Sequence, residues 1–203
     1  MKLTLFSTKQ TFLILVFINL IVQTIITRYS MLKSPKQKNK WYSLLLFICM
    51  LMLIFIMCMP IPIFIKFMVF CVFSMLQGYT LASLNINDTV FQFAFYGALS
   101  IFCSMIGISA LITMLGVKFG SKFGLGLLST LLLFILIFIF NAITGDISHK
   151  LLSAVGVVLF SIFIIYDTNI ILQRDYKGDF ISASLAYYLD FLNLFIDLSW
   201  FNQ

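Results

Sequence analysis

Three aspartates, Asp167, Asp190 and Asp197, occupy the last two apolar segments of a chain whose seven acidic residues are all aspartate. Asp167 and Asp190 fall in the middle of segments long enough to cross a bilayer, and Asp197 lies nearer the end of the last one. A charged carboxylate at mid-membrane costs at least about 2.5–3.5 kcal/mol, so its placement there points to ion or proton chemistry.

The last segment carries its polar residues on one helical face. Asp190, Asn193 and Asp197 are spaced i, i+3 and i+7, so a helix places them on one stripe. Such a stripe must face the interior of a bundle or a water-filled path, because lipid would leave it without hydrogen bonds. We interpret Asp197, near the helix end, as a residue whose carboxylate reaches water.

Asp167 and Asp190 are expected to meet. Asp167 lies 13 residues before Phe180, where the last segment begins, and Asp190 lies 10 residues after it. Two carboxylates in contact at low dielectric cannot both ionise easily, so the pair can share a proton and act as a latch. When both are charged, they form a hard-oxygen site suited to Ca²⁺. The alternative is that each aspartate only hydrogen bonds a neighbour and locks the bundle.

The composition sets the class of protein. The chain of 203 residues is 62% hydrophobic and 10% charged, and its mean hydropathy is +1.11. Because soluble domains carry roughly 25% charged residues, we predict a multi-pass membrane protein. The net charge of +6 comes from Lys and Arg in short gaps between apolar runs, which does not indicate nucleic-acid binding. The four cysteines lie within apolar runs and lack metal-ligand spacing, so we interpret them as packing residues.

Polar boundaries divide the chain into seven apolar segments, which predict an all-α, seven-helix membrane bundle forming a single transmembrane domain over residues 1–203. Pro60 and Pro62 separate the second segment from the third, and the basic stretch 28–40 separates the first from the second. Basic residues divide almost equally between the two sides, so they do not set the orientation. The predicted helices cover residues 11–27, 41–59, 63–84, 90–115, 125–143, 151–172 and 180–200.

Residues 165–169 (IYDTN) and 184–195 (SLAYYLDFLNLF) resemble the C-terminal signature of the Bax inhibitor-1 (transmembrane Bax inhibitor motif) family. Upstream, residues 95–97 (FYG), Ile101 and Phe102, the loop 116–126, Asn141 and Gly78 also resemble family features. The resemblance covers about residues 60–200 and is most specific in the YLDFLNLF run. The first two segments agree only in hydrophobic pattern.

The resemblance implies a seven-helix bundle with the last helix at its centre. It also implies a pH-sensitive Ca²⁺ leak channel in which Asp167 and Asp190 form the hydrogen-bonded sensor and a transient Ca²⁺ site. Asn193, Lys66 and Asn141 are the supporting polar residues. The family commonly has an arginine near the junction of helices two and three that can latch onto the aspartates. Here the cation near that junction is Lys66, which cannot make the bidentate pair that arginine makes.

A second function remains open: a non-conducting regulator that binds a membrane protease or another membrane complex, as relatives are described to do. An enzyme is the least favoured class, because the sequence has no nucleophile–base pair or hydrolase motif, and no resident cofactor is expected. His149, the single histidine, is interpreted as a solvated loop residue. The expected partners are the lipid bilayer, Ca²⁺ and a membrane protein. The expected location is a bacterial inner membrane, with a eukaryotic endomembrane as the alternative.

Overall fold

The computed structural model describes residues 2–35, 40–84 and 86–202, and within these it contains seven α-helices and no strand. The all-α prediction is therefore confirmed. The helices are α1 (Lys2–Lys33), α2 (Lys40–Cys58), α3 (Ile63–Ala82), α4 (Asp88–Met114), α5 (Ser121–Thr144), α6 (His149–Gln173) and α7 (Phe180–Phe201).

Six of these helices are long and apolar enough to cross a membrane, and the described apolar part of α2, Leu44–Cys58, is shorter. The chain is a multi-pass membrane protein, as its composition predicts. Among the six candidate spans α7 is the most buried, with 67% of its most apolar window covered against 11–39% for the others.

Several helix ends follow directly from the local sequence. Proline cannot continue the helical hydrogen-bond ladder, so α2 ends at Cys58 and α3 begins after Pro62. Asn87 caps α4 by accepting a 2.8 Å hydrogen bond from the Val90 amide. Gly145 ends α5 in the left-handed conformation (φ 73°), which glycine adopts without a steric penalty.

Helix α1 extends beyond the predicted segment 11–27 at both ends. The long side chains of Arg28 and Lys33 favour helix and can reach toward water while the backbone continues at the membrane edge. The first part of the expected basic stretch is therefore helical, and residues 36–39 of that stretch lie outside the described residues.

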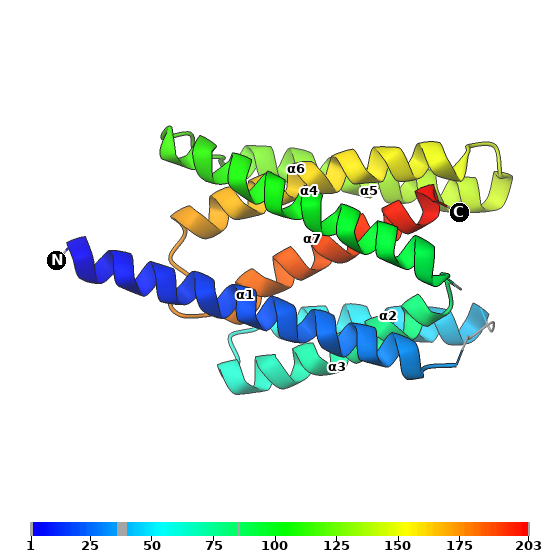
Figure 1. The fold of residues 1–203 in the computed structure, drawn as a ribbon, viewed down its shortest axis with the longest axis horizontal. Coiled ribbons are helices and arrows are strands. Elements are labelled where there is room, and N and C mark those ends of the chain that lie inside the picture. Colours follow the sequence, from blue (N-terminus) through cyan, green and yellow to red (C-terminus); the bar gives the residue numbers. More distant parts are fainter. Residues whose placement is uncertain (1, 36–39, 85, 203) are drawn as a thin grey trace. The chain divides into compact units, whose positions relative to one another are not determined.

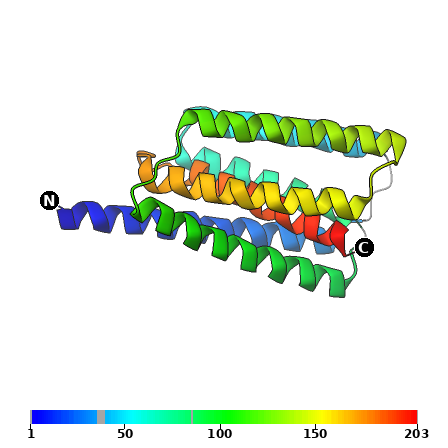
Figure 2. The same ribbon diagram turned by 90° about the horizontal axis from the view of Figure 1, so that it is seen from above.

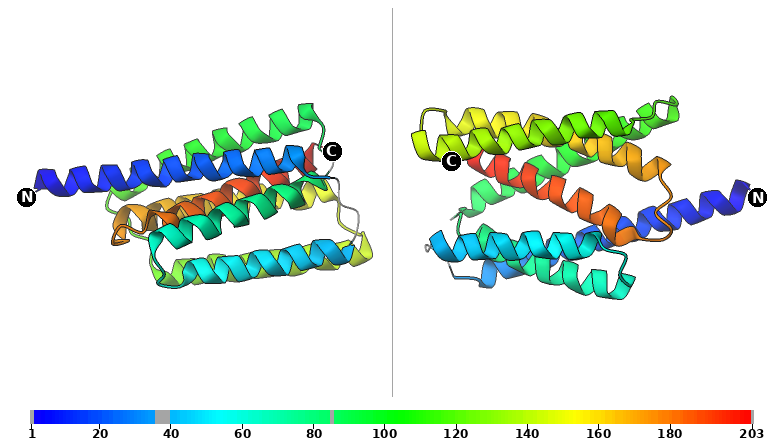
Figure 3. Two further views of the ribbon diagram at one scale, coloured as in Figure 1. Left: turned by 90° about the horizontal axis from the view of Figure 1, so that it is seen from below. Right: turned by 180° about the vertical axis from the view of Figure 1, so that it is seen from behind.

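The chain divides into two compact units, and each contains part of α7. The first unit consists of Met1–Ile86 and Tyr176–Tyr188. In it, α3 packs against both α1 and α2 (Figure 1 and Figure 3). Gly78 permits the close approach of α3 to α1, since a Cβ there would lie under 3.0 Å from the Thr27 carbonyl oxygen and the Met31 amide nitrogen.

The second unit consists of Asn87–Asp175 and Leu189–Gln203. Helix α6 packs against α4 and α5 (Figure 2), and the second part of α7 belongs to this unit. Gly97 on α4 faces Leu198 on α7, whose Cδ1 would lie 3.1 Å from a Cβ at Gly97. Both Asp167 and Asp190 fall in this second unit.

Candidate functional site

The two aspartates that were predicted to lie at mid-membrane both belong to the second unit. Asp190 on α7 is buried, with 5% of its surface exposed, and Asp167 on α6 is partly exposed. The two carboxyl groups are close enough for their negative charges to repel each other. Asp190 Oδ2 is buried without a hydrogen-bond partner. A buried carboxylate oxygen that lacks a partner is costly, so this position favours a bound proton or cation.

Aromatic packing fixes the rotation of α7 in this unit. Phe191 packs edge-on against Phe95 and Phe102 of α4, with ring centroids 5.9 and 5.8 Å apart. One turn further on, Phe195 packs against Phe91 of α4 at 5.3 Å. Because Asp190 directly precedes Phe191, these contacts also set the direction of its carboxyl group.

Asn169 secures the part of α6 that carries Asp167. Its side-chain amide nitrogen donates to Thr113 Oγ1 at 2.8 Å and to the Val117 carbonyl oxygen at 3.0 Å. Its side-chain oxygen accepts from the Phe119 amide at 2.9 Å, so the loop between α4 and α5 is tied to α6. In the sequence, Asn169 is only a letter of the IYDTN motif, and nothing in its spacing indicates this role.

The other supporting polar residues of this unit are Asn193 and Asn141. Asn193 is half-buried on α7, between Asp190 and Asp197. Asn141 is buried near the end of α5, where its side-chain oxygen accepts a 2.7 Å hydrogen bond from the Ile147 amide. Asn141 therefore holds the turn between α5 and α6.

The expectation that Asp197 reaches water is wrong. Only 7% of Asp197 is exposed, and its Oδ2 is buried without a hydrogen-bond partner. The reason lies on α6, where a Cβ at Gly156 would be under 3.0 Å from all three atoms of the Asp197 carboxyl group. The missing side chain of Gly156 gives the carboxyl group its space, a contact that the spacing of residues on α7 alone does not reveal.

Lys66 pairs with a residue that the sequence analysis did not select. In the first unit, Lys66 is buried and its Nζ lies 2.6 Å from Asp179 Oδ2 and 3.2 Å from Ser182 Oγ. Asp179 also caps the start of α7, since its Oδ1 accepts from the Ser182 amide at 3.1 Å. The available signal was an aspartate immediately before the last apolar segment, which is a common helix start.

This geometry perturbs the acidity of Asp179, which precedes the spanning part of α7. Burial raises the pKa of the Asp179 carboxyl, but the hydrogen bonds from Lys66 and Ser182 and the Lys66 charge outweigh burial and hold that pKa below its usual value. Asp179 therefore remains a charged partner for Lys66 at neutral pH.

The first unit also contains a buried chain of hydrogen-bonded polar side chains, which was not predicted from the sequence. Asn19 donates to Ser184 Oγ, Gln23 donates to Asn19 Oδ1 at 3.2 Å, and Ser74 donates to Gln23 Oε1 at 2.8 Å. Thr27 and Tyr188 share a further hydrogen bond between their hydroxyl groups. The i, i+4, i+8 spacing of Asn19, Gln23 and Thr27 was the available signal. Interhelical hydrogen bonds of this kind stabilise helix packing in membranes.

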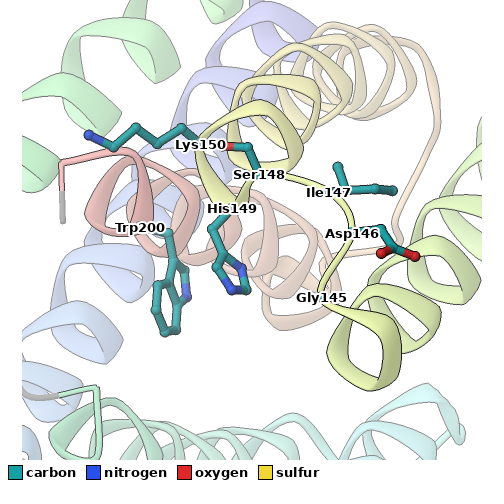
Figure 4. A pocket seen from close by; sticks show the side chains of 7 residues that line it. All are labelled: Gly145, Asp146, Ile147, Ser148, His149, Lys150 and Trp200. Carbon is teal, nitrogen blue, oxygen red and sulfur yellow. The ribbon is translucent and has the colours of Figure 1, made fainter.

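A groove of about 610 Å³ opens at the turn between α5 and α6, lined by residues 145–150 and Trp200. The His149 and Trp200 rings lie side by side, with centroids 5.8 Å apart, and Asp146 lies on the other side of the loop (Figure 4). His149 is exposed, as expected, and it also stacks on the end of α7.

Within the described ranges there is no group of three or more His, Cys, Asp or Glu residues that could hold a metal ion. The Asp167–Asp190 pair offers two carboxyl groups, fewer than the six to eight oxygen ligands that Ca²⁺ takes at a dedicated site. Any Ca²⁺ bound by the pair would keep most of its water ligands.

Comparisons with known proteins agree with the resemblance in the C-terminal motifs. The sequence model of a family described as "Inhibitor of apoptosis-promoting Bax1" matches residues 7–200. "Protein LIFEGUARD 1" of Arabidopsis thaliana is 33% identical over 81 residues, which are 40% of this chain and 34% of that protein. "Golgi anti-apoptotic protein" of Vaccinia virus (strain Lister) is 38% identical over 79 residues, 38% of this chain and 33% of that protein.

A mammalian relative shows a similar extent of likeness. "Protein lifeguard 4" of Mus musculus is 33% identical over 79 residues, 38% of this chain and 33% of that protein. The aligned part of the chain thus spans about a third of the length of these relatives.

Proposed function

The chain belongs to the family of inhibitors of apoptosis-promoting Bax1, and from this premise we propose that it is a pH-sensitive Ca²⁺ leak channel. In this proposal Asp167 and Asp190 form the sensor and the gate. The observation that carries it is the buried Asp190 carboxyl group, whose Oδ2 has no hydrogen-bond partner.

The physical basis of the gate is the number of protons on the pair. A single proton shared between the two carboxyl groups relieves their repulsion and holds α6 and α7 together at this depth. Gaining or losing a proton changes the hydrogen bond between the two carboxyl groups, and it also changes the charge that a passing ion meets. When the pair loses its proton, its carboxylate oxygens can replace part of the water around a passing Ca²⁺ ion.

The names of the relatives favour a second candidate. The Vaccinia virus relative is named an anti-apoptotic protein of the Golgi, which describes an effect on cell fate and not a transported ion. A non-conducting regulator that binds a membrane protease or another membrane complex would be consistent with such a name. In that case the buried aspartates would serve helix packing, and exposed loops would carry the function.

Ion flux separates the two candidates. We would reconstitute the full chain in liposomes loaded with a Ca²⁺-sensitive dye and compare wild type with Asp167→Asn and Asp190→Asn. Asp88→Asn is the matched control, because Asp88 is exposed at the start of α4. The channel proposal expects pH-dependent flux that both core substitutions alter and the control does not. Folded wild-type protein that gives no flux between acidic and neutral pH would exclude the channel and leave the regulator.

A further inference from the structure

Asp197 is a second buried acid on α7, outside the Asp167–Asp190 pair. It lies seven residues beyond Asp190, about 10 Å further along the helix axis. Only 7% of Asp197 is exposed, and its Oδ2 is buried without a hydrogen-bond partner. The charge that this carboxyl group carries therefore depends on what the neighbouring helices place around it.

The Asp197 carboxyl group fills the space that Gly156 leaves on α6. A Cβ at Gly156 would lie under 3.0 Å from Oδ1, Oδ2 and Cγ of Asp197. The atoms of the carboxyl group themselves occupy this space, so the site has room for a proton on the carboxyl group and for no larger ligand.

Side-chain contacts place α4 and α6 against this part of α7, and neither helix brings a positive charge to Asp197. Helix α4, whose Gly97 faces Leu198, contains no lysine, arginine or histidine. The cationic side chains of α6 are Lys150 and His149, both exposed, which precede Gly156 by six and seven residues, or about 10 Å of helix. A carboxylate at Asp197 would therefore be buried without a countercharge.

The remaining titratable side chains of α4 and α6 do not face Asp197 either. Three of them, Asp88, Tyr96 and Cys103, are exposed on α4. On α6, the Tyr166 hydroxyl lies over Gly124 of α5, and the charge of Asp167 acts on Asp190. No group on these helices thus compensates a negative charge beside Gly156.

The position of Asp197 near the end of α7 also disfavours a negative charge. Helix α7 ends at Phe201, four residues later, so Asp197 lies beside the unpaired carbonyl groups of the last turn. These carbonyl groups carry partial negative charge, and they repel a carboxylate. The positive end of α6 at His149 is two turns away from Gly156, and the effect of a helix dipole falls off within one turn.

We propose that Asp197 is a proton-binding site that controls the position of the end of α7. While the carboxyl group is protonated, it has no charge and packs against Gly156. Loss of the proton to water leaves a buried carboxylate without a countercharge, so the end of α7 moves away from α6 until water reaches that carboxylate. The proposal does not depend on the channel, because it concerns the packing of α7 on α6 and not the flux of an ion.

Trp200 reports this movement. It lies three residues beyond Asp197, lines the groove at the start of α6 and stacks on His149 (Figure 4). When the end of α7 leaves α6, the half-buried indole becomes exposed to water and its fluorescence shifts to longer wavelength. A parent protein with Trp41→Phe and His149→Gln removes the other tryptophan and the titration of the histidine.

Fluorescence of this parent in lipid nanodiscs would be followed from acidic to alkaline pH. We expect the emission of Trp200 to shift to longer wavelength as the pH rises, and Asp197→Asn to abolish the shift because asparagine stays neutral. Asp190→Asn and the exposed control Asp88→Asn should keep it. A parent that shows no shift, or a shift that survives in Asp197→Asn, would overturn the proposal.

Infrared spectroscopy tests the bound proton directly, because a protonated carboxyl group has a band that a carboxylate lacks. In the neutral-pH spectrum of the full chain, Asp197→Asn should remove one such band that Asp88→Asn keeps. If wild type and Asp197→Asn show the same bands of protonated carboxyl groups, Asp197 is not a proton-binding site at that pH and the proposal fails.

Gly156→Ala provides a second variant should Asp197→Asn fail to fold. It keeps the Asp197 carboxyl group but fills its space, so the group is displaced toward water and we expect its protonated band to be lost at neutral pH. Gly107→Ala on α4 is the matched control, because a Cβ at Gly107 meets nothing within 4 Å. An unchanged band in Gly156→Ala would overturn the proposal.

Discussion

Lys66 Nζ lies 2.6 Å from Asp179 Oδ2, and this ion pair joins the first turn of α3 to the residue that caps α7. Lys66 is the more buried partner, with 7% of its side chain exposed against 27% for Asp179. Lys66 also donates a 3.2 Å hydrogen bond to Ser182 Oγ, so both of these partners come from the start of α7.

Because Lys66 is more buried than Asp179, removing the charge of either partner should lower the free energy of unfolding by a different amount. Asp179→Asn leaves a buried lysine without its charged partner and should destabilise the protein by about 3–5 kcal/mol. Lys66→Met should cost less, about 1–3 kcal/mol, because Asp179 keeps its hydrogen bonds to Ser182 and some contact with water. Unfolding in mixed micelles measures the change in the free energy of unfolding for both variants. Equal changes, or changes near zero, would contradict the prediction that this ion pair is buried and stabilises the fold.

The same pair predicts how stability depends on acid. The pKa of the Asp179 carboxyl is lower in the folded state than in the unfolded state. Asp179 therefore contributes stability that is present above its ordinary pKa of about 3.9 and is lost as pH falls below that value. Wild type should therefore lose thermal stability more steeply on acidification than Asp179→Asn does. The measurement is the unfolding temperature in detergent at a series of acidic pH values. If the unfolding temperatures of the two proteins fall in parallel as the pH is lowered, the assigned role of Asp179 is wrong.

Gly78 predicts a steric effect in the first unit. A Cβ at this position would collide with backbone atoms of α1, which cannot move as a side chain can. Gly78→Ala should destabilise the protein by about 1–3 kcal/mol, since overpacking forces the helices apart. Gly107→Ala, where there is space, should change stability little. Thermal unfolding of both variants in the same detergent would settle the comparison, and similar losses in the two would argue against a specific contact of α1 with α3.

Asn169 predicts a local effect on the loop between α4 and α5. Asn169→Ala removes the acceptor of the Phe119 amide and a donor to the Val117 carbonyl oxygen, at a cost of about 1–3 kcal/mol. Hydrogen exchange followed by mass spectrometry should show faster exchange at residues 115–120. The capping turn at Asn141 should be unaffected, and unchanged exchange in the loop would contradict the assigned role.

The sequence was sufficient for the features that depend on composition and local pattern. The apolar runs and the proline break follow from spacing alone. Asp197 was misjudged because its burial depends on a glycine 41 residues earlier, on another helix.

Other features depend on which partner a side chain meets. Lys66 was noted as a cation, but its pairing with Asp179 requires the start of α3 to lie beside the start of α7. The Asn19–Gln23–Thr27 stripe was visible in the sequence, yet its meaning depends on Ser74, Ser184 and Tyr188, which come from two other helices.

The most direct test of the account is whether Asp167 and Asp190 act as one titrating unit. Ca²⁺ flux into liposomes would be measured against pH for wild type, Asp190→Asn, Asp167→Asn and the double variant. If the pair shares one proton, each single substitution should abolish the pH dependence, and the double variant should lose no more than either single one. Additive effects of the two substitutions, or a pH dependence that survives both, would contradict the paired-aspartate gate.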